Sequence, residues 1–233
     1  MGRAGWWGGL ARGAGRGAGC RMSVAAPRVA KVPEFTWLPA NRATPEDVET
    51  VLGAGGARRC RCQGLKVEGW IWRDSTQEER EAALVAQTAC GTDGPTSGLI
   101  GYVDGDPAGW VAVEPRENYP RIWSRKQPWM RMDPELPGVW SVTCFVVAKG
   151  HRGTGLTYEL AAATVEHARE QGATVLEGYP MEPAPGKKVI WDEASVGLLP
   201  VLLEAGYEVV ASPTQRRRVV SHHLGAEPVA TGS

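Results

Sequence analysis

The chain has 233 residues, its 26 Lys and Arg residues are balanced by 26 Asp and Glu residues, and 42% of its residues are hydrophobic. This length suits one domain with tails, and a neutral chain without a long basic run argues against binding to nucleic acid or to a membrane surface. The odd count of five cysteines without a secretory segment favours a reducing, cytoplasmic location. With no apolar run of about 18 residues and no paired cysteine or histidine spacing, we expect neither a membrane span nor a metal site.

Residues 1–30 differ from the rest of the chain, because they are rich in Gly, Ala and Arg and show no apolar period. Such a composition predicts disorder, and the segment lacks the continuous apolar stretch of a signal peptide. We therefore expect a disordered extension at residues 1–30, a folded domain at residues 31–221 and a flexible tail at residues 222–233. Met22 is a candidate for the biological start, a hypothesis that the intact mass of the native protein tests.

Order is expected to begin with a short strand at residues 35–38. A helix follows, with Thr44 as its N-cap, Pro45 at its first position and Gly53 at its end. Residues 57–74 show no clear period, so they are expected to form a connecting loop.

A second helix is predicted to end at Gly91, and a capping box of Ser75 and Glu78 opens it. Next comes a hairpin with strands at residues 99–103 and 109–113, joined by a turn with the sequence DGDP. Residues 119–138 mix aromatic, basic and proline residues, and an irregular segment of this length is typical of a functional loop.

The second half of the chain begins with an apolar stretch at residues 139–148, which is typical of a central strand that is covered on both faces. A helix at residues 155–171 follows, then a strand at residues 173–183, a helix near Pro200 and a last pair of strands. This order predicts an α/β fold with a mixed sheet of about six or seven strands and helices on both faces.

The loop between the central strand and its helix has the sequence KGHRGTGLT. Gly150, Gly153 and Gly155 allow the backbone to bend and to approach a ligand closely. The first amides of the helix lack carbonyl partners, and Arg152 adds a positive charge beside them. Together these groups predict a diphosphate site.

Two familiar phosphate sites fit this loop less well. A nucleoside triphosphate loop requires Lys followed by Ser or Thr after its last glycine, whereas Leu156 and Thr157 stand here. A dinucleotide site requires a third glycine where Tyr158 stands, although Glu177 lies at the distance expected for a ribose-binding acid. A dinucleotide-binding oxidoreductase therefore stays a third choice.

The loop resembles that of the GNAT superfamily of N-acetyltransferases, and the similarity extends to a bacterial subgroup of unassigned substrate. The family hallmark is Arg or Gln, two residues, Gly, one residue and Gly or Ala, after a long central strand. Residues Arg152 to Thr157 match it except at the last position, where Thr157 replaces a smaller residue. The hairpin GYVDGDPAGWVAVEPR looks like the one that precedes this motif, and the order of elements extends the resemblance over about residues 35–220.

The resemblance implies acetyl-CoA as co-substrate and no metal. The pyrophosphate would lie on the amides of the loop, namely Arg152, Gly153, Thr154, Gly155, Leu156 and Thr157. The strands at residues 141–147 and 174–179 would be parallel neighbours that splay apart. Free backbone groups of Phe145, Val146 and Val147 would then pair with the pantetheine arm, and an amide near Phe145 would stabilise the thioester oxygen.

The acid and base of such a reaction are not evident. Leu202 stands where the family often has a tyrosine, and Ser141, Thr143 and Cys144 stand where other members have a carboxylate. Glu114 and Tyr179 are the candidate catalytic residues, although a solvated strand end explains Glu114 better and packing at a strand end explains Tyr179 better.

Two further groups of residues have open roles. His167 is expected on the exposed side of its helix. Trp70, Trp72, Trp123 and Trp129 flank the irregular segments, where they either line an acceptor pocket or pack the loops on the core.

The resemblance favours transfer of an acetyl group from acetyl-CoA to a primary amine by direct attack on the thioester. The acceptor, a small-molecule or peptide amine, is not identified, and the family suggests a homodimer. The alternative is a degenerate domain that binds CoA without turnover as a sensor or interaction module, which the loss of the tyrosine at Leu202 motivates.

Overall fold

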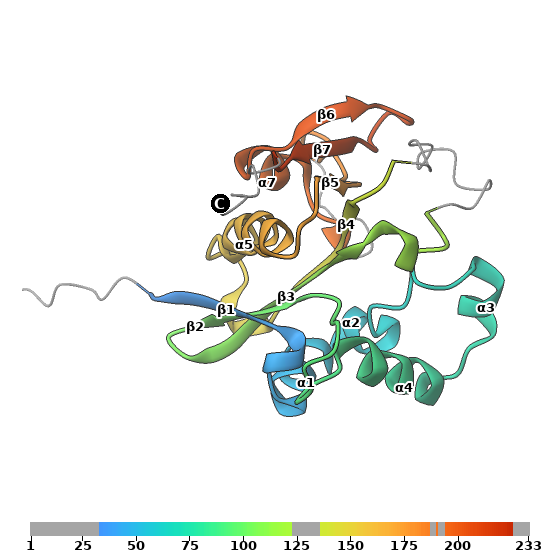
Figure 1. Cartoon of the computed structure of the whole chain (residues 1–233), viewed down its shortest axis with the longest axis vertical. Coiled ribbons are helices and arrows are strands. Elements are labelled where there is room, and N and C mark those ends of the chain that lie inside the picture. The colour runs from blue at the N-terminus through green and yellow to red at the C-terminus, as the bar shows by residue number, and fades with distance from the viewer. Residues whose placement is uncertain (1–32, 123–135, 187–189, 191–193, 226–233) are drawn as a thin grey trace, which may run out of the picture. The chain divides into compact units, whose positions relative to one another are not determined.

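The computed structural model describes residues 33–122, 136–186, 190 and 194–225 (Figure 1). The expected extension at residues 1–30 lies outside them, as do residues 123–135 of the long irregular segment and residues 226–233. The tail was predicted to begin too early, because strand β7 (Val219–His223) includes the first two residues of the range 222–233.

One mixed sheet of seven strands organises the described residues, as Figure 1 shows. Its strands are β1 (Phe35–Pro39), β2 (Leu99–Val103), β3 (Asp106–Pro115), β4 (Val139–Val147), β5 (Val175–Gly178), β6 (Glu208–Ala211) and β7. Their spatial order is β1-β2-β3-β4-β5-β7-β6, and the paired strands are antiparallel except for β4 and β5. The predicted mixed α/β sheet is confirmed.

Helices cover both faces of the central strands. The described helices are α1 (Pro45–Leu52), α2 (Gly55–Cys60), α3 (Gly69–Asp74), α4 (Gln77–Thr88), α5 (Leu156–Glu170) and α7 (Leu199–Glu204), with short 3-10 turns at Ala40–Arg42, Arg116–Asn118 and Lys149–His151. Both α1 and α5 contact β3 and β4, and they lie on opposite sides of these strands (Figure 1).

Successive side chains of each strand point to opposite faces of the sheet, which divides the core into two layers. Val111 and Val142 pack with Leu160 under α5, whereas Trp110 and Ala112 pack with side chains of α1 and α4. The central strand is therefore apolar on both faces, as its sequence predicts.

The segment 57–74 differs from the prediction of a connecting loop, because it contains the end of α2 and all of α3. Each helix has six residues, which is too short for an apolar period to appear in the sequence, and tertiary packing stabilises such helices. Ala57 of α2 is buried against the α1 side of the core.

The start of α1 follows the sequence closely, since Thr44 accepts from the Asp47 amide and Pro45 opens the helix. In α4 the capping box lies one residue later than predicted. Thr76 and Glu79 form it, because the Ser75 hydroxyl donates to the Trp72 carbonyl at the end of α3.

A β-bulge interrupts the pairing of β3 with β4. Ala112 pairs with Cys144 and Val113 with Val142, so Thr143 is an extra residue on β4. Such a bulge changes which side chains a strand presents to each face.

The parallel pairing of β4 with β5 is confirmed, and it covers Val139–Val142 and Val175–Gly178. Beyond Val142, β4 continues to Val147 paired with β3 but not with β5, so β4 and β5 part at the end that leads to the glycine loop.

Candidate functional site

The glycine loop connects β4 to α5, and its conformation explains two of its glycines. Gly153 and Gly155 have φ angles of 77° and 87°, in the left-handed region that other residues rarely adopt. Gly155 is the N-cap of α5. The amides of Leu156 and Thr157 therefore open the helix, where no preceding turn supplies a carbonyl partner.

A cavity of about 660 Å³ adjoins this loop. Its wall comes from the end of β4, the loop, the first turn of α5, residues 194–198 and α7, and includes Phe145, Val147, His151, Arg152, Gly153, Gly155, Leu156, Thr157, Tyr158, Ser195 and Val201. Apolar side chains thus lie next to a cationic loop with open amides. Such a wall suits a ligand with an apolar arm and an anionic group.

Arg152 lies at the entrance of the loop. Its Nε donates to the Val147 carbonyl over 3.1 Å, and the side chain is exposed. The Thr154 hydroxyl donates to the His151 carbonyl over 2.7 Å, which tightens the turn before α5. The guanidinium is therefore held against the end of β4, and Arg152 lines the same cavity as Leu156 and Thr157.

The backbone of β4 departs from the expectation of free groups near Phe145 and Val147. The Phe145 amide donates to the Ser195 carbonyl over 2.6 Å, and the Val147 carbonyl accepts from Arg152. Ser195 thus lies against β4 where β5 has ended, so any ligand that pairs with the Phe145 amide must first displace it.

A second cavity of about 500 Å³ also adjoins β4. Thr143 and Cys144, the residues at the bulge, form part of its wall together with Ser195. The remaining lining residues come from distant segments: Gly56, Arg59, Cys60, Cys62, Gly64, Leu65, Trp72, Arg121, Val196 and Arg217. Successive residues of β4 therefore line two cavities, and Ser195 contributes to both.

Four tryptophans were considered above for an acceptor pocket. Among the described residues, Trp72 is the one of these four that lines the second cavity. Trp70 lines a separate shallow hollow near α3 and is largely exposed. Trp123 and Trp129 lie outside the described residues.

Glu114 ends β3 and is held by two neighbours. Its Oε1 lies 2.5 Å from the Lys66 ammonium, and its Oε2 accepts from the Asn118 amide over 2.9 Å. The side chain is 4% exposed and does not line the cavities on β4. The structure therefore places Glu114 in a buried ion pair.

Tyr179 belongs to a second buried polar cluster. Its hydroxyl lies 3.0 Å from both the Ser141 hydroxyl and Glu177 Oε2, and Glu177 forms an ion pair with Arg116 over 2.8 Å. Burial raises the pKa of the Tyr179 phenol well above its ordinary value, and the Glu177 carboxylate raises it further. Tyr179 is fully buried and also does not line the cavities on β4.

Leu202 of α7 is fully buried, and its side chain packs closely on Gly178 at the end of β5. An apolar residue at this position supplies no proton. The structure therefore brings together the glycine loop, β4 and Ser195, but neither Glu114 nor Tyr179 joins them.

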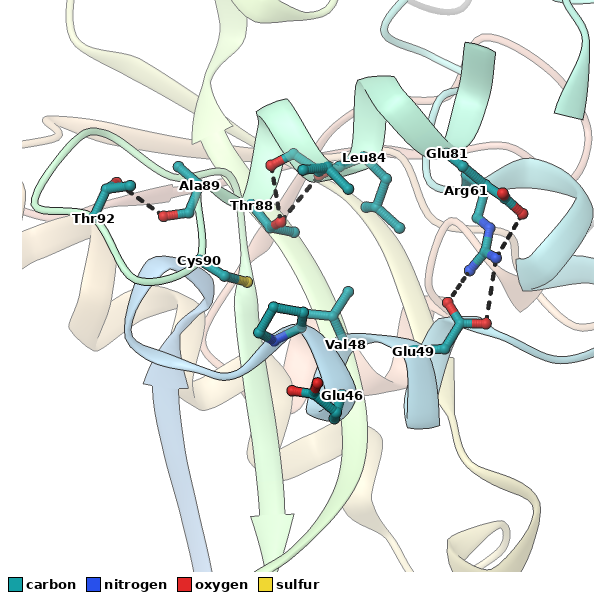
Figure 2. Close-up of a pocket in the computed structure, with 12 residues that line it drawn as sticks. Glu46, Val48, Glu49, Arg61, Glu81, Leu84, Thr88, Ala89, Cys90 and Thr92 are labelled. Carbon is teal, nitrogen blue, oxygen red and sulfur yellow. Dashed lines mark hydrogen bonds and ion pairs between the residues drawn. The ribbon is translucent and has the colours of Figure 1, made fainter. Parts of the chain in front are cut away.

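A third hollow, of about 660 Å³, lies between α1 and α4 (Figure 2). At one end of it the Arg61 guanidinium forms ion pairs with Glu49 over 2.7 Å and with Glu81 over 2.8 Å. Figure 2 shows these carboxylates reaching Arg61 from the two helices, with Val48 and Leu84 farther along the hollow. The ion pairs join α1 to α4, and we assign this hollow no part in the site on β4.

Within the described residues, no group of three or more His, Cys, Asp or Glu side chains is arranged to hold a metal ion. None of the described helices combines the length and the apolar character that a membrane span requires.

Sequence reasoning missed the arginines of the second cavity. Arg59, Arg121 and Arg217 are far apart in the chain and belong to no motif, so no local signal marks them.

Comparison with known proteins gives one match to a family. The model of the acetyltransferase (GNAT) family matches residues 65–180, a range that includes β3, β4, the glycine loop and α5. No curated protein matches the chain.

Several solved structures are similar to the chain. An N-acetyltransferase from Staphylococcus aureus Mu50 is 12% identical, with 82% of this chain and 99% of that chain covered and a TM-score of 0.48. A GCN5-related N-acetyltransferase from Kribbella flavida is 16% identical, with coverage of 81% and 97% and a TM-score of 0.48. The protein yncA from Salmonella typhimurium, described with its cofactor acetyl-CoA, is 12% identical, with coverage of 85% and 99% and a TM-score of 0.47.

Proposed function

Because the chain belongs to the GNAT acetyltransferase superfamily, we propose that it binds acetyl-CoA and transfers the acetyl group to a primary amine. The observation that carries this proposal is the loop Arg152-Gly153-Thr154-Gly155 at the start of α5, which opens onto the cavity lined by Phe145 and Val147.

The residues of this cavity fit a coenzyme of that kind. Gly153 and Gly155 have open space where a Cβ would stand, so nothing in the chain blocks a close approach to their backbone. The amides of Leu156 and Thr157, with the Arg152 guanidinium, would hold the pyrophosphate. The apolar wall at Phe145 and Val147 would hold the pantetheine arm, and Val146 lies between them on β4. The bound coenzyme supplies the acetyl group as a thioester.

The acceptor amine would enter from the second cavity, where Thr143 and Cys144 of β4 form part of the wall. Attack requires a neutral amine, and none of the described residues that line this cavity is a carboxylate that could take its proton. We assign Glu114 and Tyr179 to positioning, because each is buried in a cluster that holds the strands around β4. The proton would then pass to solvent at the cavity mouth.

A second candidate function is a domain that binds CoA without turnover. Two observations favour it, namely the Phe145 amide that Ser195 occupies and the buried Leu202 at the position of the family tyrosine. Transfer to any amine in a broad acceptor screen would exclude it.

We propose a cytoplasmic location for either function. Cys60, Cys62, Cys90 and Cys144 are free thiols in the structure, which suits a reducing compartment.

Thermal unfolding of the protein with acetyl-CoA, with NAD or without ligand tests the binding step. A ligand at about 100 times its dissociation constant stabilises by about 2.7 kcal/mol, which corresponds to several degrees for a domain of this size. We expect this shift with acetyl-CoA alone, and we expect Arg152→Glu to abolish it.

The matched control is Arg169→Glu, which reverses an exposed charge at the far end of the same helix. A shift with NAD alone, or no shift with acetyl-CoA, would overturn the proposal. Release of CoA thiol in the presence of amines then separates transfer from binding without turnover.

A further inference from the structure

The second cavity on β4 is markedly cationic. Arg59, Arg121 and Arg217 line it, and none of its described lining residues is an aspartate or a glutamate. The rest of the wall is polar but uncharged, as at Thr143, or apolar and aromatic, as at Leu65 and Trp72. An amine acceptor is itself a cation in water, so this cavity has the wrong sign for a simple amine.

Arg121 is the best defined of the three arginines. Its Nη1 donates to the Gly64 carbonyl over 2.7 Å, which fixes the guanidinium in the wall, and the side chain is only partly exposed. It forms no ion pair with any residue that the structure describes. By contrast, Arg61, Arg116 and Arg218, elsewhere in the same domain, are each paired with a carboxylate.

Arg217 also lines the wall, and its Nη1 donates to the Tyr179 carbonyl over 2.7 Å. That carbonyl follows directly after β5, so the guanidinium lies near the point where β4 and β5 part. Arg59 is exposed at the end of α2 and adds a third positive charge. The inference rests on Arg121, and the other two strengthen the same field.

A field of this sign has two effects on an acceptor. Nearby positive charges disfavour the ammonium form, which lowers the pKa of the amine and supplies the neutral nucleophile. They also weaken binding, unless the acceptor carries negative charge of its own. The planar guanidinium binds carboxylate and phosphate groups through two parallel hydrogen bonds, which gives both affinity and orientation.

We propose that the acceptor is a small amine that carries a carboxylate or phosphate group, and that Arg121 binds this anion while the amine points to Thr143 and Cys144 on β4. The proposal deepens the acetyltransferase function proposed above and rests on it. Leu65, Trp72 and Val196 would enclose the short chain between the two charged ends.

Matched pairs of amines test the proposal: L-alanine against L-alaninamide, L-glutamate against its diamide, and O-phosphoethanolamine against ethanolamine. We expect kcat/KM for acetyl transfer to be at least about 10-fold higher for the anionic member, since a hydrogen bond between charged groups contributes about 1.5–3 kcal/mol. The first two pairs report on a carboxylate and the third on a phosphate.

Two variants at one position separate anion binding from structure. Arg121→Gln should lower kcat/KM for the anionic member by about 10- to 100-fold, mainly through KM, and should lower kcat/KM for the neutral member far less, through the pKa of the amine alone. Arg121→Lys keeps the charge but loses the two parallel N–H donors of the guanidinium. Its kcat/KM for the anionic member should lie between the values of the unmodified protein and Arg121→Gln, and it replaces Arg121→Gln if that variant folds poorly. The control is Arg58→Gln, an exposed arginine of α2 that does not line the cavity.

Failure of this proposal is distinguishable from failure of the acetyltransferase function. Preference for neutral or cationic amines, or an equal loss for both members of a pair in Arg121→Gln, overturns the inference and leaves acetyl transfer intact. A smaller thermal shift with acetyl-CoA in Arg121→Gln assigns the arginine to the coenzyme, which also overturns it. Retained acetyl-CoA binding without acetylation of any amine contradicts the function itself and removes the inference with it.

Discussion

The two cavities that β4 lines are encoded in different ways. Much of the coenzyme side comes from one continuous stretch, residues 145–158, in which strand, glycine loop and helix follow one another. The second cavity, where we propose that the acceptor binds, is assembled from α2, α3, Arg121, the bulge on β4 and Arg217, which are distant in the chain. A local motif therefore fixes the first cavity, whereas the second depends on how distant segments pack. Substitutions at one cavity should leave the other cavity intact, except at buried residues that support both of them.

The largest expected effect is at that shared support, the buried ion pair of Arg116 with Glu177. Arg116→Met leaves the Glu177 carboxylate buried without this partner, so we expect the free energy of unfolding to fall by about 3–5 kcal/mol. Binding of acetyl-CoA and of acceptor should weaken together, because Glu177 lies on β5 and contacts Tyr179. Urea unfolding measures the loss.

The control for this change is Arg42→Met, which removes an exposed ion pair with Asp93. Exposed pairs contribute about 0–1 kcal/mol, so little change is expected there. Equal effects of the two substitutions would contradict the role given to the buried pair.

A smaller effect, confined to the coenzyme side, is expected for Gly155→Val. The φ angle of 87° forces a β-branched residue into a disfavoured conformation, at a cost of about 1–3 kcal/mol. The thermal shift with acetyl-CoA should disappear, because relaxation of the strain moves the first amides of α5. In contrast, Gly150→Ala has open space at Cβ and no positive φ, and should keep the shift.

Away from the residues that line either cavity, Thr76→Ala removes the capping box of α4, and we expect a loss of about 1 kcal/mol. The helix packs on the α1 side of the core, so the acetyl-CoA shift should persist while stability falls. Differential scanning calorimetry measures both quantities. Thr50→Ala, an exposed threonine inside α1, serves as control and should not destabilise. Loss of acetyl-CoA binding in Thr76→Ala would show that the cavity beside the glycine loop depends on the α1 side of the core.

The effect of acid is of similar size and acts through α5. His167 is 3% exposed between the rings of Trp37 and Trp140, and burial lowers its pKa to about 4. A depressed folded-state pKa means that the unfolded chain takes up the proton first. The stability that the neutral imidazole contributes is thus complete above pH 6.5 and declines as the pH falls from 6.5 towards 4. We expect a loss of about 1 kcal/mol at pH 5.5.

Urea unfolding at pH 7.5 and 5.5 measures this dependence, and His167→Leu should flatten it. An unchanged pH dependence in that variant would assign the decline to other groups.

The expectation of an exposed His167 was wrong. Its side chain turns towards the sheet, and the apolar period of α5 does not indicate that this position is buried.

Short-range chemistry specifies several elements that can be predicted from the sequence: the cap of α1, the hairpin of β2 and β3, the apolar central strand, the glycine loop and α5. Adjacent residues set these features, since a cap, a turn or a positive φ involves only a few neighbours. The mixed sheet then follows from the order of the elements.

The other features depend on tertiary contacts. In the six-residue helix α2 the core buries Ala57, whereas α3 buries none of its residues. Ser195 reaches the Phe145 amide because β5 ends before β4. In the sequence, Glu114 also fits a solvated strand end and Tyr179 also fits packing at a strand end, yet burial gives each a fixed partner. Arg121 and Arg217 meet at one cavity although nothing in their neighbouring residues points there. Contacts between distant segments depend on the path of the whole chain, and that path is set by the packing of both core layers against one sheet.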